Sequence, residues 1–118
     1  KKQGFIEVLN SRTNQLMRMN VSLLEDIEAN KLGSLSIENA VKKLNSPLLI
    51  IHGEQDLTVP IEEGEQLFNW SNKILTQFEK IPASGHTFDI VHPFESSNKK
   101  FDLVITKTEE FLGKVFKV

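Results

Sequence analysis

Residues 47–56 read Pro-Leu-Leu-Ile-Ile-His-Gly-Glu-Gln-Asp and carry the clearest indication of the fold. Its four consecutive apolar residues show no alternation, which is typical of a strand covered on both faces inside a parallel sheet. A glycine follows the strand, and Asp56 lies just beyond it. A second strand, expected over about residues 75–81, leads in the same way to Gly85 and His86. The sequence therefore predicts two strands that each end in a glycine turn with an ionisable residue.

Helices are expected between and after these strands. Pro60 suits a first helical turn, and apolar residues follow it at helical spacing: Ile61, Gly64, Leu67 and Phe68. A last helix is expected from about residue 98 to 116, covering one face of the sheet. The order strand, helix, strand implies a right-handed crossover with both strand ends at one edge of the sheet. We therefore expect Asp56 and His86 on the same side.

Residues 1–46 follow a different pattern. A polar run at residues 10–14 separates two apolar stretches and predicts a hairpin. Ser22-Leu23-Leu24-Glu25 fits a capping box at the start of a short helix, which should reach about Lys31 and be closed by Gly33. A second helix should follow Ser36 and end at Pro47. We expect two parts: residues 1–46 as a hairpin and helical segment, resembling an insertion or lid, and residues 47–118 as a β-α-β-α unit.

Composition restricts the class of protein. With 39% hydrophobic and 25% charged residues, the chain should be a folded globular piece. Its longest apolar run is far short of the roughly 18 residues that indicate a membrane span. A net charge of −2 without a basic field argues against nucleic acid as a partner. The chain has no cysteine and no apolar signal peptide, so we expect a cytoplasmic protein. Because residue 1 is Lys rather than Met, we expect the native N-terminus to lie upstream.

Asp56 and His86 are two of the three residue types of a hydrolytic triad. A serine hydroxyl is a poor nucleophile, so a neutral imidazole must remove its proton as it attacks an acyl carbon. A carboxylate on the other ring nitrogen fixes the tautomer and stabilises the imidazolium that forms. His86 would be the base and Asp56 its orienter. Gly53 and Gly85 are expected where a β-carbon would clash with the sharply turning backbone.

These residues, in this order, resemble the C-terminal portion of the α/β-hydrolase family, nearest to its dienelactone-hydrolase and prolyl-oligopeptidase-like serine esterases. The likeness covers residues 47–116. In that family the chain order of the triad is Ser, Asp, His. Residues 53–60 are similar to the family segment that carries the acid after the seventh strand. Gly85-His86-Thr87-Phe88 is similar to the segment that carries the histidine after the eighth strand. The resemblance implies the C-terminal half of an α/β-hydrolase sheet, in an enzyme that hydrolyses small-molecule carboxylic esters. It implies no cofactor and no metal.

Each candidate residue has an alternative interpretation. Asp56 could cap the helix that begins near Pro60, and Glu54 could be the acid instead. His86 could be an ordinary loop histidine. His52 is expected to be a hydrogen-bonded part of the scaffold. Metal binding by the three histidines lacks any H-E-x-x-H or equivalent spacing.

The nucleophile is missing from these 118 residues. None of the nine serines lies in a G-x-S-x-G turn, and Ser84 is too close in sequence to His86. We expect the full-length protein to be the enzyme and this chain alone to be inactive. A peptidase of the prolyl-oligopeptidase type, or a non-catalytic binding domain on the same scaffold, remains open. Two parallel strands also leave an apolar sheet edge unpaired, so we expect the chain to self-associate.

Overall fold

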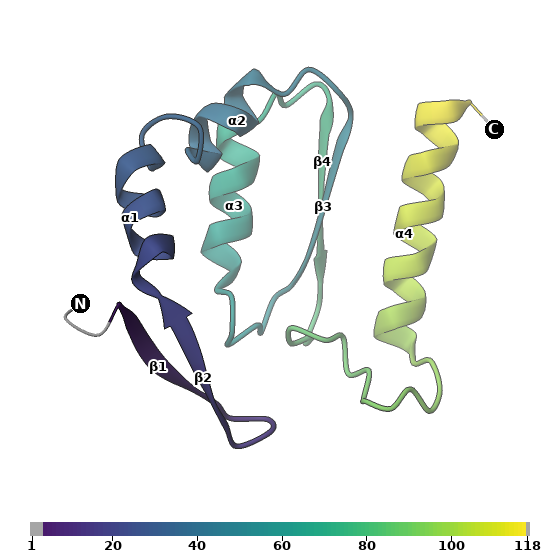
Figure 1. The fold of residues 1–118 in the computed structure, drawn as a ribbon. Coiled ribbons are helices and arrows are strands. Elements are labelled where there is room, and N and C mark those ends of the chain that lie inside the picture. Colours follow the sequence, from purple (N-terminus) through teal and green to yellow (C-terminus); the bar gives the residue numbers. More distant parts are fainter. Residues whose placement is uncertain (1–3, 118) are drawn as a thin grey trace. The chain divides into compact units, whose positions relative to one another are not determined.

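The computed structural model describes residues 4–117, which divide into two compact units, one up to Asn39 and the other from Ala40 on. Figure 1 labels the elements of both units. The expected mixed α/β class is confirmed: a hairpin and two short helices precede two parallel strands with flanking helices. The functional division expected between residues 46 and 47 stays a prediction.

The first unit contains the predicted hairpin. Strands β1 (Phe5–Asn10) and β2 (Gln15–Asn20) pair antiparallel, with Phe5 opposite Asn20 and Asn10 opposite Gln15. The amides of Thr13 and Asn14 both donate to the carbonyl of Asn10 and close the turn. Asn14 has a φ of 57°, a left-handed conformation that asparagine tolerates better than most residues. The polar run therefore forms the turn because its residues suit this backbone.

The capping box predicted at Ser22 is wrong. Helix α1 (Val21–Asn30) begins one residue earlier, so Ser22 lies inside its first turn, and the cap residue is Asn20, whose side chain makes no capping hydrogen bond. The amide of Val21 donates to the carbonyl of Gly4 at 3.0 Å. Strand β2 thus runs directly into the helix, and the strand rather than a serine cap sets where the helix begins.

The end of α1 and the start of α2 follow the prediction. Lys31 is the C-terminal cap residue of α1, and the amide of Gly33 donates to the carbonyl of Asn30 in the turn that follows. Ser36 precedes α2 (Ile37–Lys43), and its hydroxyl accepts a hydrogen bond from the amide of Asn39 at 3.2 Å. Helix α2 already ends before residue 44, so Pro47 does not itself terminate it.

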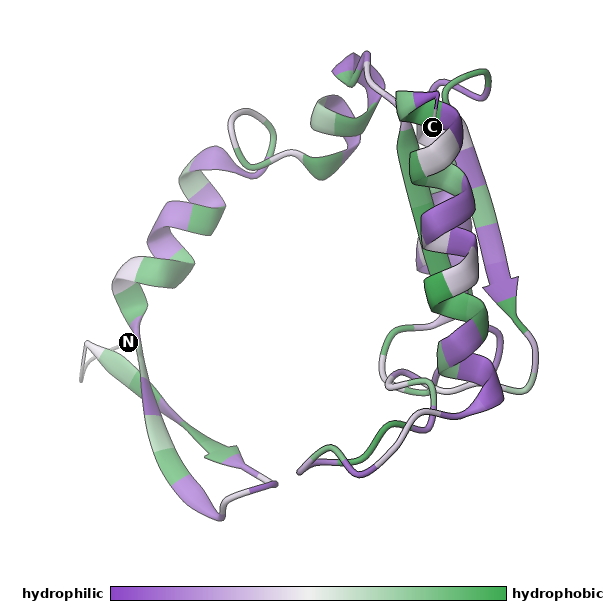
Figure 2. Cartoon of the chain, turned by 90° about the vertical axis from the view of Figure 1, so that its right-hand side faces the viewer, coloured by the Kyte–Doolittle hydropathy of each residue, from purple (hydrophilic) through white to green (hydrophobic). Residues whose placement is uncertain are grey.

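The second unit is a parallel β-α-β-α arrangement. Strands β3 (Leu48–Gly53) and β4 (Thr76–Ile81) pair in parallel, with Leu48 beside Thr76 and Gly53 beside Ile81. Helices α3 (Ile61–Trp70) and α4 (Lys99–Phe116) pack on opposite faces of these strands (Figure 1). In Figure 2 the visible part of β3, behind α4, is coloured hydrophobic, as expected for a strand covered on both faces.

Packing around these strands positions the loops at their carboxyl ends. Ile50 and Ile81 are buried in the core, and the rings of Phe68 and Phe78 join α3 to β4 with centroids 5.8 Å apart. Gly64 allows α3 to approach β3 closely, because a β-carbon there would lie 3.1 Å from Cδ2 of His52.

Within residues 4–117, no helix is both long enough and apolar enough to cross a membrane.

Candidate functional site

Two loops leave the same edge of the β3–β4 pair and are hydrogen-bonded to each other. The amide of Glu54 donates to the carbonyl of Ile81 at 3.0 Å, and the amide of Gln55 donates to that of Ser84 at 2.9 Å. These bonds continue the pairing of the parallel strands beyond their ends. The loop that carries Asp56 is therefore held against the loop that carries His86.

The crossing of these loops requires a glycine at position 53. A β-carbon on Gly53 would lie 2.3 Å from the carbonyl oxygen of Ser84 and 2.5 Å from that of Gly85, well inside contact distance. The expected steric role of Gly53 is thus confirmed. For Gly85 the same expectation is wrong, because a β-carbon there would meet no atom within 4 Å and its φ lies outside the left-handed region. The crowding is on the Gly53 side of the crossing only.

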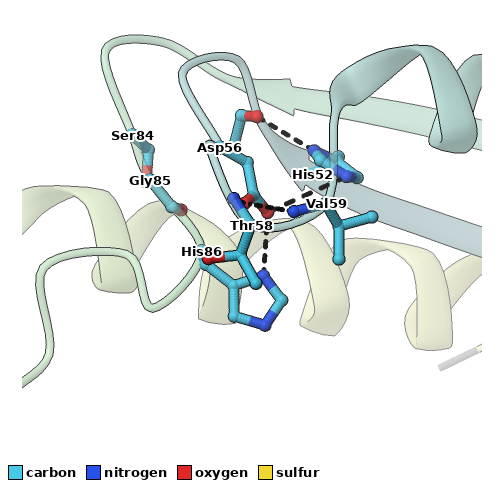
Figure 3. A network of polar contacts seen from close by, with 8 residues as sticks. His52, Asp56, Thr58, Val59, Ser84, Gly85 and His86 are labelled. Atoms are coloured by element: carbon cyan, nitrogen blue, oxygen red, sulfur yellow. Dashed lines mark hydrogen bonds and ion pairs between the residues drawn. The ribbon is translucent and has the colours of Figure 1, made fainter. Parts of the chain in front are cut away.

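The structure brings the side chains of Asp56 and His86 together, as Figure 3 shows. Nδ1 of His86 lies 2.9 Å from Oδ2 of Asp56, while Oδ1 accepts hydrogen bonds from the amides of Thr58 and Val59, each at 2.9 Å. The Asp56 side chain is 4% exposed and that of His86 is 46% exposed. Because an ionised carboxylate only accepts hydrogen bonds, Nδ1 carries the proton. In the neutral imidazole Nε2 then bears the lone pair, and this atom has no partner among residues 4–117.

Opposing effects set the pKa of Asp56. Burial raises this pKa, since the charged form loses hydration. The Val59 amide, the His86 ring and the Thr58 amide all stabilise the carboxylate and together outweigh burial, so the pKa falls from 3.8 to about 2. Asp56 is therefore ionised at neutral pH and able to hold the His86 ring in one tautomer.

The structure also decides two of the alternative interpretations. Asp56 does not cap α3: the residue before that helix is Pro60, and no side chain caps it. Its Oδ1 instead binds the two loop amides ahead of the helix, which leaves Oδ2 for His86. Glu54 is exposed, and no contact in the described residues joins it to His86. Asp56 is thus the acid that meets the histidine.

His52 lies beside the same carboxylate, within ion-pair distance but without a hydrogen bond to it (Figure 3). Its Nδ1 donates to the carbonyl of Gly53 at 2.9 Å, which leaves Nε2 facing Oδ2 of Asp56 at 3.9 Å, beyond hydrogen-bond distance. The ring packs against Gly64 of α3. His52 is therefore hydrogen-bonded within the scaffold, as its place at the end of a buried strand indicated, but its nearness to Asp56 gave no signal in the sequence.

A cavity of about 300 Å³ opens beside these residues. It is lined by Ile51, His52, Gly53, Asp56, Val59, His86 and Phe88. Its walls combine apolar side chains with those of Asp56, His52 and His86. Among residues 4–117, no three or more of the His, Asp and Glu side chains are grouped so that they could hold a metal ion.

Side chains at the start of α4 contact the loop that carries His86, and no pattern in the sequence indicates these contacts. Nζ of Lys100 donates to the carbonyl of Ala83 and to the carboxylate of Asp89, both at 2.6 Å. Nδ2 of Asn98 donates to the carbonyl of Phe88 at 3.0 Å. Asn98 was expected only near the start of the last helix, and no spacing pattern indicated Lys100.

An acid and a histidine thus meet at the carboxyl edge of a pair of parallel strands. No protein-family model matches the chain. Over 60 residues the chain is 38% identical to human Protein ABHD12B, an α/β-hydrolase domain protein. The match covers 51% of this chain and 16% of that protein, so the chain spans less than a fifth of this relative's length. The likeness supports a relationship to α/β-hydrolases, and the dienelactone-hydrolase branch stays a prediction.

Proposed function

We propose that the chain is part of a serine hydrolase that acts on carboxylic esters, with His86 as general base and Asp56 as its orienter. The observation that carries the proposal is the 2.9 Å contact between Nδ1 of His86 and Oδ2 of Asp56. The side chain of His86 is half-exposed, and its Nε2 has no partner in residues 4–117. That nitrogen is the atom that would accept a proton from an attacking hydroxyl.

The chemistry follows from these contacts. As a serine hydroxyl attacks the acyl carbon, His86 would take the hydroxyl proton on Nε2 and then give it to the departing alkoxide. The second half of the reaction repeats these transfers with water as the nucleophile. Asp56 would stabilise the imidazolium in each half without taking its proton, which agrees with its lowered pKa. The serine and the oxyanion donors would come from sequence outside these 118 residues.

Ser84 is a poor candidate for the nucleophile on structural grounds as well. It is fully buried, with 0% of its surface exposed. Its hydroxyl lies 3.3 Å from the carbonyl of Gly85, and its own carbonyl accepts the Gln55 amide. A buried hydroxyl of this kind has no approach to a substrate. The chain of 118 residues is therefore expected to show no esterase activity by itself.

The proposal predicts coding sequence upstream of Lys1, and its test uses the protein extended by that sequence. Hydrolysis of p-nitrophenyl butyrate should fall about 10⁴-fold in kcat for Asp56→Asn, because the imidazole loses its fixed tautomer. His86→Ala should lose at least as much, because the base itself is gone. Glu54→Gln is the matched control, since it removes an exposed carboxylate from the same loop and should leave kcat unchanged.

The other outcomes decide between the alternatives. Cleavage of peptide anilides without ester hydrolysis would support the prolyl-oligopeptidase-type peptidase instead. If the extended protein neither turns over esters nor reacts with a fluorophosphonate probe, it is a non-catalytic domain on this scaffold. Ester turnover by the 118-residue chain, abolished in His86→Ala, would contradict the expectation that the nucleophile lies elsewhere.

A further inference from the structure

The loop that carries His86 has an unusual backbone. Ala83, Phe88 and Asp89 have φ values of 52°, 54° and 61°, and none of them is glycine. Left-handed backbone is sterically disfavoured for residues with a β-carbon, most of all for a bulky one such as phenylalanine. Three such residues within seven positions persist only when surrounding contacts fix them. The position of His86, between the first and the second of them, depends on those contacts.

The contacts that α4 and its cap residue make to this loop fall on the same three residues. Lys100 binds the carbonyl of Ala83, three residues before His86, and the carboxylate of Asp89, three residues after it. Asn98 donates to the carbonyl of Phe88. Each left-handed residue is thus held by one of two side chains at the start of α4.

Asn98 performs two tasks with different atoms of its side-chain amide. Its Oδ1 accepts the amide of Phe101 at 3.0 Å and so caps α4. Its Nδ2 donates to Phe88 and so reaches the His86 loop. The helix cap and the loop contact are therefore made by one residue, which couples the beginning of α4 to the turn at His86.

We propose that Lys100 and Asn98 are positioning residues that hold His86 so that Nδ1 stays on Asp56. The proposal rests on the proposed function for its catalytic consequence, but the placement of the ring can be measured without catalysis. The Lys100 ammonium group binds Ala83 before His86 and Asp89 after it, and so holds both sides of the loop together. The side-chain amide of Asn98 fixes Phe88 between them. When these donors are lost, the loop relaxes toward ordinary backbone conformations and the ring leaves the carboxylate.

The test uses two variants that remove donors and little else. Lys100→Met keeps the apolar stem and loses the ammonium group. Asn98→Asp keeps an oxygen to cap α4 and loses the donor to Phe88. Lys99→Met is the matched control, because it removes the neighbouring positive charge on the same helix without a contact to the loop. The fluorescence of Trp70, the single tryptophan, reports whether each variant stays folded.

The first readout is the tautomer of His86, obtained from the ¹⁵N shifts of its ring in the 118-residue chain. The wild type and Lys99→Met should show the Nδ1–H form alone, and the other two variants a mixture with the Nε2–H form. A single Nδ1–H form in both variants would overturn the proposal. A mixture in Asn98→Asp alone would assign the positioning to Asn98 and overturn the role of Lys100.

The second readout is kinetic and uses the extended protein. Lys100→Met should lower kcat for the ester on the order of 10- to 100-fold with KM unchanged, because a misplaced base slows the chemical step without weakening binding. An unchanged kcat in a variant with mixed tautomers would contradict the catalytic consequence. If the wild type has no activity and the tautomer changes still occur, the proposed function fails and the positioning by α4 stands.

Discussion

Replacing Gly53 by alanine tests the crossing of the two loops most directly. The new β-carbon would lie 2.3 Å from the carbonyl oxygen of Ser84, 2.5 Å from that of Gly85 and 2.8 Å from the carbonyl carbon of Ser84. All three are backbone atoms, so no flexible side chain can move aside. The carbonyl of Ser84 also accepts the amide of Gln55 at 2.9 Å, and pushing the loops apart breaks this bond.

The size of the effect follows from these two losses. Overpacking of a crowded site costs about 1–3 kcal/mol, and a lost hydrogen bond adds about 1 kcal/mol. We expect Gly53→Ala to lower the free energy of unfolding by about 2–4 kcal/mol, a large part of the stability of a domain of this size. With a urea slope of about 2 kcal/mol/M, the unfolding midpoint should fall by roughly 1–2 M.

Gly85→Ala is the matched control, one loop away. Its β-carbon would meet no atom within 4 Å, and its backbone is compatible with alanine. The unfolding free energy should stay unchanged or rise by up to about 1 kcal/mol, because alanine restricts the unfolded chain. Trp70 lies in the same unit as both glycines, so its fluorescence in urea reports the relevant transition. Equal midpoints for the two variants would refute the steric account of Gly53.

Three further predictions concern the acid, the helix cap and association. The pKa of Asp56 is lowered from 3.8 to about 2, so its ionised form stabilises the fold above pH 3.8, and this stabilisation is lost as the pH falls from about 4 to 2. The urea midpoints of the wild type and Asp56→Asn should therefore converge over this pH range. A difference between the midpoints that stays constant down to pH 2 would contradict this prediction. Asn98→Ala removes the cap of α4 and should cost about 1 kcal/mol in thermal unfolding followed by circular dichroism, whereas a melting curve like that of the wild type would show that the cap is not needed. Self-association through the free strand edges should appear as a concentration-dependent sedimentation coefficient, and a monomer at the highest concentration would argue against it.

The sequence is most informative where apolar residues follow a period or form a run. Leu48–Ile51 predicts a strand covered on both faces, and the order strand, helix, strand predicts that Asp56 and His86 lie at one edge of the sheet, as they do. These inferences hold because burial and chain connectivity leave few arrangements open. The start of α1 is harder to predict, because the preceding strand sets it through the contact between Val21 and Gly4.

Contacts between loops leave no periodic or continuous apolar pattern in the sequence. Gly53 and Gly85 look alike in sequence, since each follows an apolar strand, but only the first is crowded. Lys100 is 17 residues from Ala83 and 11 from Asp89, and nothing in its neighbourhood distinguishes it from Lys99. Such roles depend on how two loops and a helix end meet in space, which neither spacing nor composition encodes.

The two oxygens of the Asp56 carboxylate have different partners, and this links the fold to the proposed chemistry. Oδ1 holds the loop through Thr58 and Val59, and Oδ2 holds His86, so one ionised group fixes both the backbone and the ring. Asparagine at this position could still offer one oxygen to the loop, but its amide nitrogen would face Nδ1–H as a donor. The fold would then survive with the ring free to adopt the other tautomer. Asp56→Asn therefore separates two properties that the wild type combines: its effect on stability comes from the lost charge, and its effect on hydrolysis comes from the lost acceptor for His86.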